Sequence, residues 1–137
     1  MDKELVIIGY IRSSIKDLDE APKMEDEPGA VQATIELDPT YIDGLEQMQP
    51  GAELEIFTWL HKADRSVLKV HPRGKKDIPQ RGVFTTRSPF RPNPIGVHKV
   101  TLIAIENNSD LIVEPIEVID GTPVVDIKSK PKEPPHS

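Results

Sequence analysis

The chain has 137 residues, a net charge of −6 and no cysteine. This length fits one domain, and the lack of cysteine excludes disulfides and thiolate metal sites. The charge is uneven, because residues 61–99 carry +8 and the rest of the chain carries −14. The acidic total therefore does not exclude a polyanionic partner such as a nucleic acid. The alternative is that these charges are simply solvated.

The N-terminal region argues against membrane insertion. Its apolar run, residues 5–11, is too short to span a bilayer, and the mixed charges before it are unlike those of a signal peptide. We therefore expect a soluble, cytoplasmic protein with no membrane contact. We also expect no metal, because the close spacings typical of histidine ligands are lacking among His61, His71, His98 and His136.

The hydrophobic pattern predicts short strands. Residues 5–11 form a continuous apolar run, and residues 30–37 alternate apolar and polar as in a half-buried strand. Asn107-Asn108 between two such runs indicates a hairpin turn, and Pro115 inside another run indicates a strand edge or a bulge. Further strand-like segments are residues 53–60, 66–70, 82–86, 97–105, 111–119 and 123–127.

A single helical segment is predicted. Asp38-Pro39 is typical of an N-cap followed by proline at the first helical position, and Pro50-Gly51 ends the helix. Strands and helices do not alternate, so a Rossmann-like parallel sheet is not expected. We predict a mainly β fold: a small, mostly antiparallel, closed or nearly closed β-barrel with one short helix. Residues 1–128 are expected to form this single domain, and residues 129–137 a flexible C-terminal tail.

Residues 81–96, with the sequence RGVFTTRSPFRPNPIG, are rich in proline and arginine. Each proline fixes its own φ angle and restricts the residue before it. The segment is therefore stiff, and it holds Arg87 and Arg91 at defined positions. Guanidinium groups on a stiff backbone suit planar anions such as phosphate or carboxylate. The alternative is a structural proline-rich corner whose arginines face solvent.

The same segment carries a family resemblance. The strings GVFTTRSPFRPNPIG at 82–96 and DGTPVVDIK at 120–128 resemble the TrmO family, also called YaeB-like or TsaA-like proteins, and the resemblance covers nearly the whole chain. It implies a short, single-domain tRNA methyltransferase with S-adenosylmethionine as cofactor. It also implies methylation of N6 of N6-threonylcarbamoyladenosine at position 37, in the anticodon loop, by a homodimer with a β-barrel fold.

The resemblance implies the cofactor contacts, and the chemistry of the reaction and the basic charge pattern suggest the other site residues. Arg87 is a catalytic candidate that would hold the cofactor or a developing anion. Asp120 is a second candidate that would accept a hydrogen bond, or alternatively belongs to an Asp-Gly turn. His61 is either a base or a structural wall. The implied cofactor contacts are Pro22, Lys23, His61, Lys62, Arg87, Val97, Ile116, Glu117, Val118 and Ile119, and the expected tRNA contacts are Arg91, Arg73, Lys75, Lys76 and Arg81.

Other interpretations stay open on the sequence alone. The same fold could methylate a small molecule or a protein, or it could bind S-adenosylmethionine without catalysis. Among the aromatic residues, Phe57 and Trp59 lie inside a strand pattern and are expected in the core rather than as base-stacking platforms. Phe90, in the proline-rich segment, is a candidate to stack on a base or on adenine.

Overall fold

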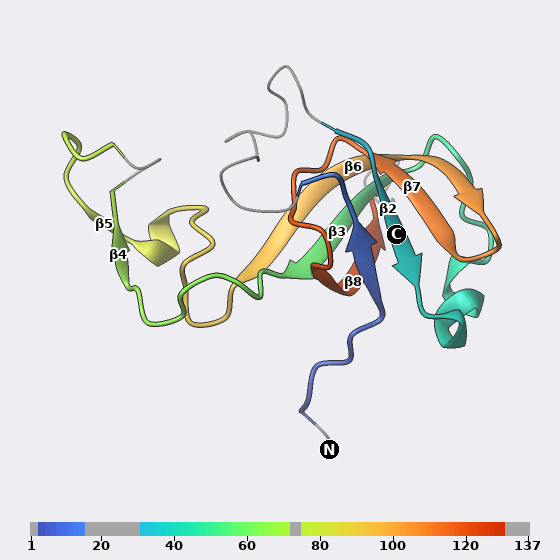
Figure 1. Cartoon of the computed structure of the whole chain (residues 1–137), viewed down its shortest axis with the longest axis horizontal. Coiled ribbons are helices and arrows are strands. Elements are labelled where there is room, and N and C mark those ends of the chain that lie inside the picture. The colour runs from blue at the N-terminus through green and yellow to red at the C-terminus, as the bar shows by residue number, and fades with distance from the viewer. Residues whose placement is uncertain (1–2, 16–30, 72–74, 131–137) are drawn as a thin grey trace, which may run out of the picture.

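The computed structural model describes residues 3–15, 31–71 and 75–130. Six strands form a closed barrel in the order β1-β2-β7-β6-β3-β8, with every neighbouring pair antiparallel (Figure 1). This confirms the predicted mainly β, closed antiparallel barrel. The strands are β1 (Gly9–Arg12), β2 (Ala33–Leu37), β3 (Glu53–Trp59), β6 (Ile95–Glu106), β7 (Asp110–Glu114) and β8 (Pro123–Ser129).

Alternating side chains build the core. In β2 the apolar residues Ala33, Ile35 and Leu37 are buried, as the pattern at 30–37 predicts, because successive side chains of a strand point to opposite faces. Closure of the barrel leaves no unpaired edge along these six strands. The remaining buried core residues come from all around the barrel and include Ile11, Leu54, Ile56, Val100, Leu102, Leu111, Val113 and Val124.

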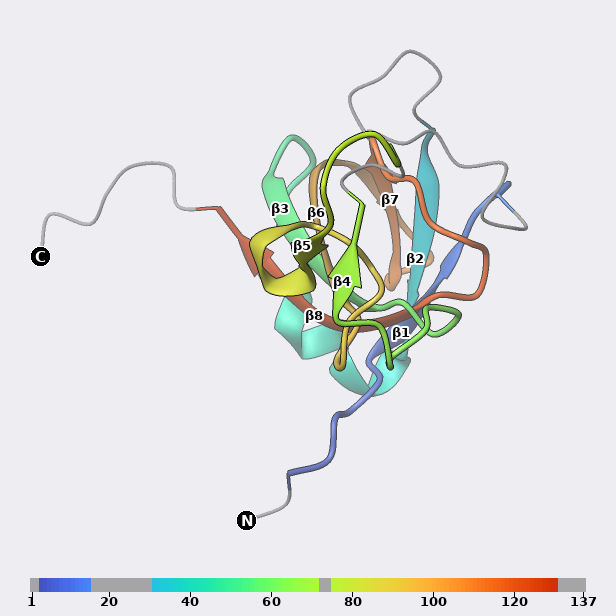
Figure 2. The same ribbon diagram turned by 90° about the vertical axis from the view of Figure 1, so that its left-hand side faces the viewer.

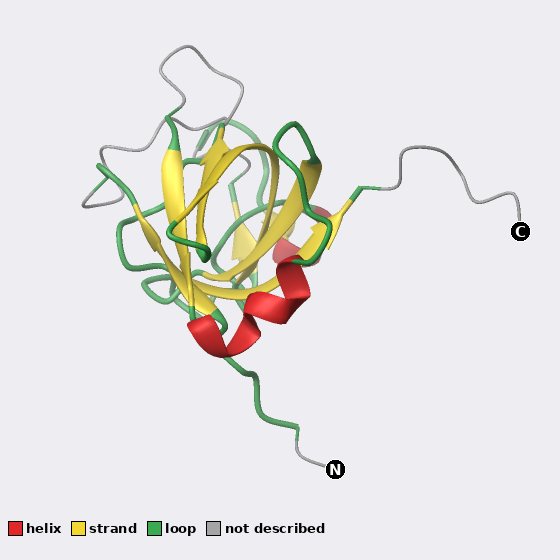
Figure 3. Ribbon diagram, turned by 90° about the vertical axis from the view of Figure 1, so that its right-hand side faces the viewer, coloured by secondary structure: helices red, strands yellow, loops and turns green. Residues whose placement is uncertain are grey.

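The predicted cap and turn are both present. The helix is a 3₁₀ helix, η2 (Pro39–Leu45), and the backbone N–H of Thr40 donates to the Asp38 carboxylate at 2.9 Å. This hydrogen bond lowers the pKa of Asp38 below its usual value. Figure 3 shows the helical turns in red near one end of the barrel. Asn107 and Asn108 have φ angles of 52° and 68°, as a tight hairpin between β6 and β7 requires.

The strand predicted at 82–86 is wrong. Only Arg81–Gly82 is extended, as β5, which pairs with β4 (Lys69–Val70), and a 3₁₀ turn, η4 (Val83–Thr85), follows. The Thr85 hydroxyl donates to the Gly82 carbonyl at 2.8 Å, and the Thr86 hydroxyl donates to the Val83 carbonyl at 2.9 Å. These local side-chain hydrogen bonds compete with strand pairing and favour a turn.

The strand predicted at 111–119 is too long. β7 ends at Glu114, and a cis peptide bond joins Glu114 to Pro115. Proline has no N–H for the strand ladder. Ile116 is nevertheless fully buried, and its N–H donates to the Val31 carbonyl at 2.9 Å. The apolar run after Pro115 therefore packs inward as a loop instead of continuing the strand.

Two further expectations need correction. β1 begins at Gly9, so residues 5–8 lie before the first strand. Phe57 and Trp59 are half-buried rather than in the core, because Ile56 and Thr58 occupy the inward positions of β3. The two aromatic side chains therefore belong to the outer face of the barrel.

The segment between β3 and β6 projects from the barrel. Figure 1 shows β4 and β5 displaced to the left of the six barrel strands, and in Figure 2, viewed from that side, they lie in front of the barrel. We call residues 66–71 and 75–86 the basic arm, because Lys69, Lys75, Lys76 and Arg81 are exposed there. Its two strands contain two residues each, so the arm contributes little regular structure.

The last strand reaches the start of the predicted tail. β8 extends to Ser129, and residues 131–137, most of the predicted tail, lie outside the described residues. Among the described residues, no helix is long and apolar enough to cross a membrane.

Candidate functional site

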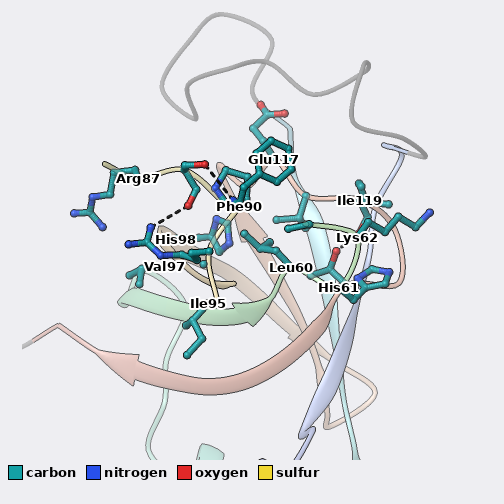
Figure 4. Close-up of a pocket in the computed structure, with 17 residues that line it drawn as sticks. Leu60, His61, Lys62, Arg87, Phe90, Ile95, Val97, His98, Glu117 and Ile119 are labelled. Carbon is teal, nitrogen blue, oxygen red and sulfur yellow. Dashed lines mark hydrogen bonds between the residues drawn. The ribbon is translucent and has the colours of Figure 1, made fainter. Parts of the chain in front are cut away.

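A cavity of about 380 Å³ lies where the end of β3 meets the starts of β6 and β8. Four segments and Thr122 line it: residues 60–63 after β3, residues 87–91 before β6, residues 95–98 at the start of β6, and residues 117–119 after β7. Figure 4 shows Arg87 on one side of the cavity and His61 on the other, with Phe90 and Leu60 between them. The antiparallel register thus gathers segments that are distant in the sequence.

The proline loop, residues 87–94, is folded around Arg91. One guanidinium nitrogen of Arg91 donates to the carbonyls of Ser88 at 2.9 Å and Thr86 at 3.3 Å, and the other donates to the Val83 carbonyl at 3.2 Å. The same guanidinium lies 5.9 Å from the centre of the Phe84 ring. The sequence predicted that the Arg91 guanidinium binds a substrate anion, and in the structure this group stabilises the backbone of the proline loop.

A second arginine, which the sequence reasoning missed, ties the loop to β3. Nε of Arg65 donates to the Pro92 carbonyl at 2.6 Å, and its guanidinium lies 5.0 Å from the Trp59 ring centre. Ser88 adds a local turn, because its hydroxyl accepts a 3.1 Å hydrogen bond from the Phe90 N–H. The loop is therefore held by specific contacts as well as by proline.

Arg87 differs from these two arginines. It is exposed and lines the cavity. Within residues 3–15, 31–71 and 75–130, its guanidinium has no hydrogen-bond acceptor. A guanidinium on a rigid rim is suited to pair with an anionic group of a bound molecule.

On the opposite rim, His61 and Lys62 are both exposed and line the cavity. A turn fixes this segment, because the Ala63 N–H donates to the Leu60 carbonyl at 2.9 Å. Just beyond it, the side chain and the backbone N–H of Ser66 donate to Asp64 at 2.6 and 2.8 Å, which lowers the pKa of the Asp64 carboxyl. The segment that carries His61 and Lys62 is therefore ordered by local contacts.

The segment after β7 supplies the apolar wall. Val118 and Ile119 are 4% and 7% exposed and line the cavity beside Glu117, whose carboxylate oxygens are buried. Val97, on β6, also lines it. Of the cofactor contacts implied by the resemblance, Ile116 belongs to the core and not to the cavity lining. Pro22 and Lys23 lie outside the described residues.

Asp120 takes part in the corner before β8. Its carboxylate accepts a 2.8 Å hydrogen bond from the Ser13 N–H, and its own N–H donates to the Ile15 carbonyl at 2.7 Å. The next residue, Gly121, has a φ of 86°, which suits glycine in a tight turn. Asp120 is not among the residues that line the cavity, and these two hydrogen bonds tie the segment just after β1 to the corner.

Among the predicted tRNA contacts that the structure describes, only Arg91 lines the cavity. Lys75, Lys76 and Arg81 are exposed on the basic arm, and Arg73 lies outside the described residues. No group of three or more potential metal ligands occurs in the part of the chain that the structure describes.

His98 and Thr58 were not selected from the sequence. His98 lines the cavity, is 8% exposed and shares a 2.9 Å hydrogen bond with the Thr58 hydroxyl. The available signal was the strand pattern, which puts a threonine and a histidine at inward positions of two apolar strands. Leu60, Phe90 and Thr122 also line the cavity without having been assigned to the cofactor.

The fold and the site define the class of protein: a small closed antiparallel barrel that can bind a ligand in a partly apolar cavity with a cationic rim at one end. This class is distinct from the doubly wound sheets that bind nucleotides. The tRNA-methyltransferase O N-terminal domain family matches residues 10–132. The chain belongs to this family, which confirms the resemblance carried by residues 82–96 and 120–128.

Several relatives support this assignment. The chain is 40% identical over 121 residues to an S-adenosyl-L-methionine-binding protein of Archaeoglobus fulgidus, covering 88% of this chain and 84% of that protein. It is 38% identical over 121 residues to a probable S-adenosyl-L-methionine-binding protein of Methanothermobacter thermautotrophicus, covering 88% and 85%. The crystal structure of TrmO from P. aeruginosa superposes with a TM-score of 0.73 at 32% identity, covering 95% of this chain and 55% of that one. The chain thus spans just over half the length of that TrmO.

Proposed function

We propose that the chain is an S-adenosylmethionine-dependent methyltransferase that methylates N6 of threonylcarbamoyladenosine at position 37 of tRNA. One observation carries the proposal: the proline loop and the segment after β7 meet at one cavity, which combines an apolar wall with a cationic rim. Membership of the tRNA-methyltransferase O family supports it, and so do the relatives named as S-adenosyl-L-methionine-binding or probable S-adenosyl-L-methionine-binding proteins. Such a reaction would take place in the cytoplasm, where tRNA acts.

The cavity lining fits the cofactor. Val118 and Ile119 offer apolar surface for an adenine ring or a thioether chain, and Phe90 offers an aromatic one. The buried carboxylate of Glu117 suits the positive charge of an ammonium or sulfonium group, and Lys62 suits a carboxylate. When bound, the cofactor supplies an activated methyl group on a sulfonium sulfur.

The protein itself would contribute alignment and electrostatics. A rigid rim holds the acceptor nitrogen in line with the methyl group, and such positioning can be worth several kcal/mol, on the order of 7 or more in favourable cases. Arg87 faces the anionic charge that develops as the acceptor loses its proton. Asp120 would act indirectly, because its hydrogen bond with the Ser13 N–H fixes the corner between the apolar wall and β8.

The basic arm would bind the tRNA backbone. Lys75, Lys76 and Arg81 are exposed on it, and lysine and arginine contacts to phosphates supply affinity that falls steeply with salt. Arg87 links the two regions, because it lies on the cavity rim next in sequence to the arm.

We also propose a homodimer. Ile95 and Val97 are 42% and 39% exposed and are paired in register with Trp59 and Phe57 on the same outer face of β3 and β6. An exposed apolar face of this kind is typical of an interface. We expect Phe57→Glu to shift the chain from dimer to monomer in light scattering, whereas a wild-type monomer would contradict the dimer proposal.

The activity is tested by methyl transfer from labelled S-adenosylmethionine. The purified chain is incubated with tRNA that carries or lacks the threonylcarbamoyl group, and the tRNA is then digested to nucleosides. Label in the modified adenosine alone supports the proposal. Label in no tRNA, despite cofactor binding, favours a small-molecule or protein methyltransferase or a non-catalytic cofactor-binding module.

A further inference from the structure

Phe84, on the basic arm, is an aromatic side chain that belongs neither to the barrel core nor to the cavity lining. It is 75% exposed, the largest exposed fraction among the large apolar side chains of the described residues. A single exposed apolar side chain is common on protein surfaces and needs no function. Phe84 differs from that ordinary case in how its backbone is held and in which charges lie near it.

The turn that carries Phe84 is anchored by burial and by hydrogen bonds. The preceding residue, Val83, is 1% exposed, and its N–H donates to the Leu68 carbonyl at 2.9 Å. The hydroxyls of Thr85 and Thr86 donate to backbone carbonyls of the η4 turn at 2.8 and 2.9 Å. Because Val83 points inward and the turn is hydrogen-bonded, the backbone presents the Phe84 ring to solvent at a fixed place.

A guanidinium supports the Phe84 ring from one side. It belongs to Arg91 and lies over the ring, 5.9 Å from the ring centre. Three hydrogen bonds to backbone carbonyls hold this guanidinium, so the support is itself fixed. Arg91 also lines the cavity, which puts Phe84 beside the cavity rim. Since the side chain is 75% exposed, the ring still offers an aromatic surface to solvent.

The arm that carries Phe84 is positively charged. Lys75, Lys76 and Arg81 are exposed on it, and Arg87 is exposed on the cavity rim. Surfaces that bind single-stranded nucleic acid combine cations that contact phosphates with aromatic rings on which bases stack. A protein partner that covered the ring with apolar surface would have to bury these charges at a cost in free energy. The charges therefore favour RNA as the molecule that covers Phe84.

We propose that Phe84 is a base-stacking residue for the tRNA and that it binds the nucleotide next to the one that enters the cavity. This inference rests on the proposed function, which assigns the cavity to the cofactor and the modified adenosine. A nucleobase stacks on the exposed surface of the ring while Arg91 supports the ring from the other side. The stacked base fixes the strand at the cavity rim, so that the neighbouring nucleotide is held at the cavity.

The first test measures RNA affinity and its dependence on salt. The full chain is titrated with an anticodon stem-loop RNA that carries threonylcarbamoyladenosine at position 37. We expect Phe84→Leu to weaken binding roughly tenfold at every salt concentration. The slope of log affinity against log salt should not change, because no charge is lost. Phe84→Trp should restore the wild-type affinity, since an indole also stacks, and both variants should bind S-adenosylmethionine as the wild type does.

The matched control is Tyr10→Leu. Tyr10 is also an exposed aromatic residue, at 51%, but it lies on β1, outside the basic arm and outside the cavity lining. Loss of this ring should leave the RNA affinity at the wild-type value. An equal loss of affinity in Tyr10→Leu and Phe84→Leu would overturn the inference, because the effect would not depend on where the ring lies.

The second test locates the stacked base. Abasic nucleotides are introduced one at a time into the loop of the RNA, and each RNA is bound to the wild type and to Phe84→Leu. At one position, next to nucleotide 37, removal of the base should weaken wild-type binding about tenfold and Phe84→Leu binding hardly at all. Equal losses in both proteins at every position would mean that no base stacks on Phe84.

The outcomes separate this inference from the proposed function. If the wild type binds no tRNA, the tRNA substrate is wrong and the stacking role fails with it. If the wild type binds and methylates the RNA while Phe84→Leu binds it equally well, the stacking role alone is wrong. A reduced salt slope in Phe84→Leu would also overturn the role, because the substitution would then act through the phosphate contacts of the arm. So would an affinity of Phe84→Trp as low as that of Phe84→Leu.

Discussion

In the barrel, six antiparallel strands close around a continuous apolar core, whereas the basic arm has two strands of two residues each. The barrel keeps charges away from its interior, and the arm exposes lysine and arginine. This difference separates two tasks: a rigid cavity that binds a small molecule, and a charged surface that binds a polymer. Substitutions in the two regions should therefore affect stability, cofactor binding and RNA binding separately.

The largest effect is expected for a deletion in the barrel core. Ile56 is fully buried, so Ile56→Ala should lower the free energy of unfolding by roughly 2–5 kcal/mol. Its counterpart on the arm, Ile78, is 37% exposed, and Ile78→Ala should change that free energy by less than about 0.5 kcal/mol. Denaturant titration measures both. Equal losses would mean that the arm is part of the same packed core.

Arg87 and Arg91 both line the cavity from the proline loop, but their replacement by alanine should have opposite effects on activity and on stability. Arg87→Ala should abolish methyl transfer and leave the thermal midpoint close to that of the wild type, because the side chain is exposed at the rim. Arg91→Ala removes three hydrogen bonds to backbone carbonyls and should cost roughly 1–3 kcal/mol of stability. Turnover assays and thermal unfolding test the pair, and wild-type turnover in Arg87→Ala would remove Arg87 from the site.

A smaller and more selective effect is expected on the arm. Replacing Lys75, Lys76 and Arg81 together by alanine should weaken tRNA binding and reduce its salt dependence by roughly one unit of slope for each phosphate that the arm no longer binds. The affinity for S-adenosylmethionine should not change, because none of the three residues lines the cavity. Filter binding at several salt concentrations measures the slope. An unchanged slope would place the RNA surface elsewhere.

The sequence predicted the barrel well because alternation is a local signal. Residues 30–37 indicate which face of β2 is buried, and Asn107-Asn108 indicates a hairpin; the structure confirms both. The strand predictions failed at 82–86 and after Glu114. At 82–86 threonine hydroxyls bind backbone carbonyls, and after Glu114 a proline has no N–H to donate to the neighbouring strand. Composition favours a strand at both places, and only the hydrogen-bonding partners reveal the turn or the loop.

The site was only partly predictable. The composition of residues 81–96 indicated the proline loop, the resemblance to a family added the residues near 117–119, and the structure places both at one cavity. The sequence could not show that Arg91 binds backbone carbonyls while Arg87 stays on the rim, since the two arginines occur in the same motif. The Thr58–His98 pair depends on the register between β3 and β6, and such a pairing across strands leaves no local pattern.

The most direct measurement for the central claim is a backbone NMR titration of the full chain with S-adenosylmethionine. We expect the largest chemical-shift changes at residues 117–119, at residues 87–91 and at residues 96–98, which line the cavity, with little change at residues 75–82 of the basic arm. Shifts confined to the arm, or no shifts at saturating cofactor, would contradict the assignment of this cavity as the cofactor site.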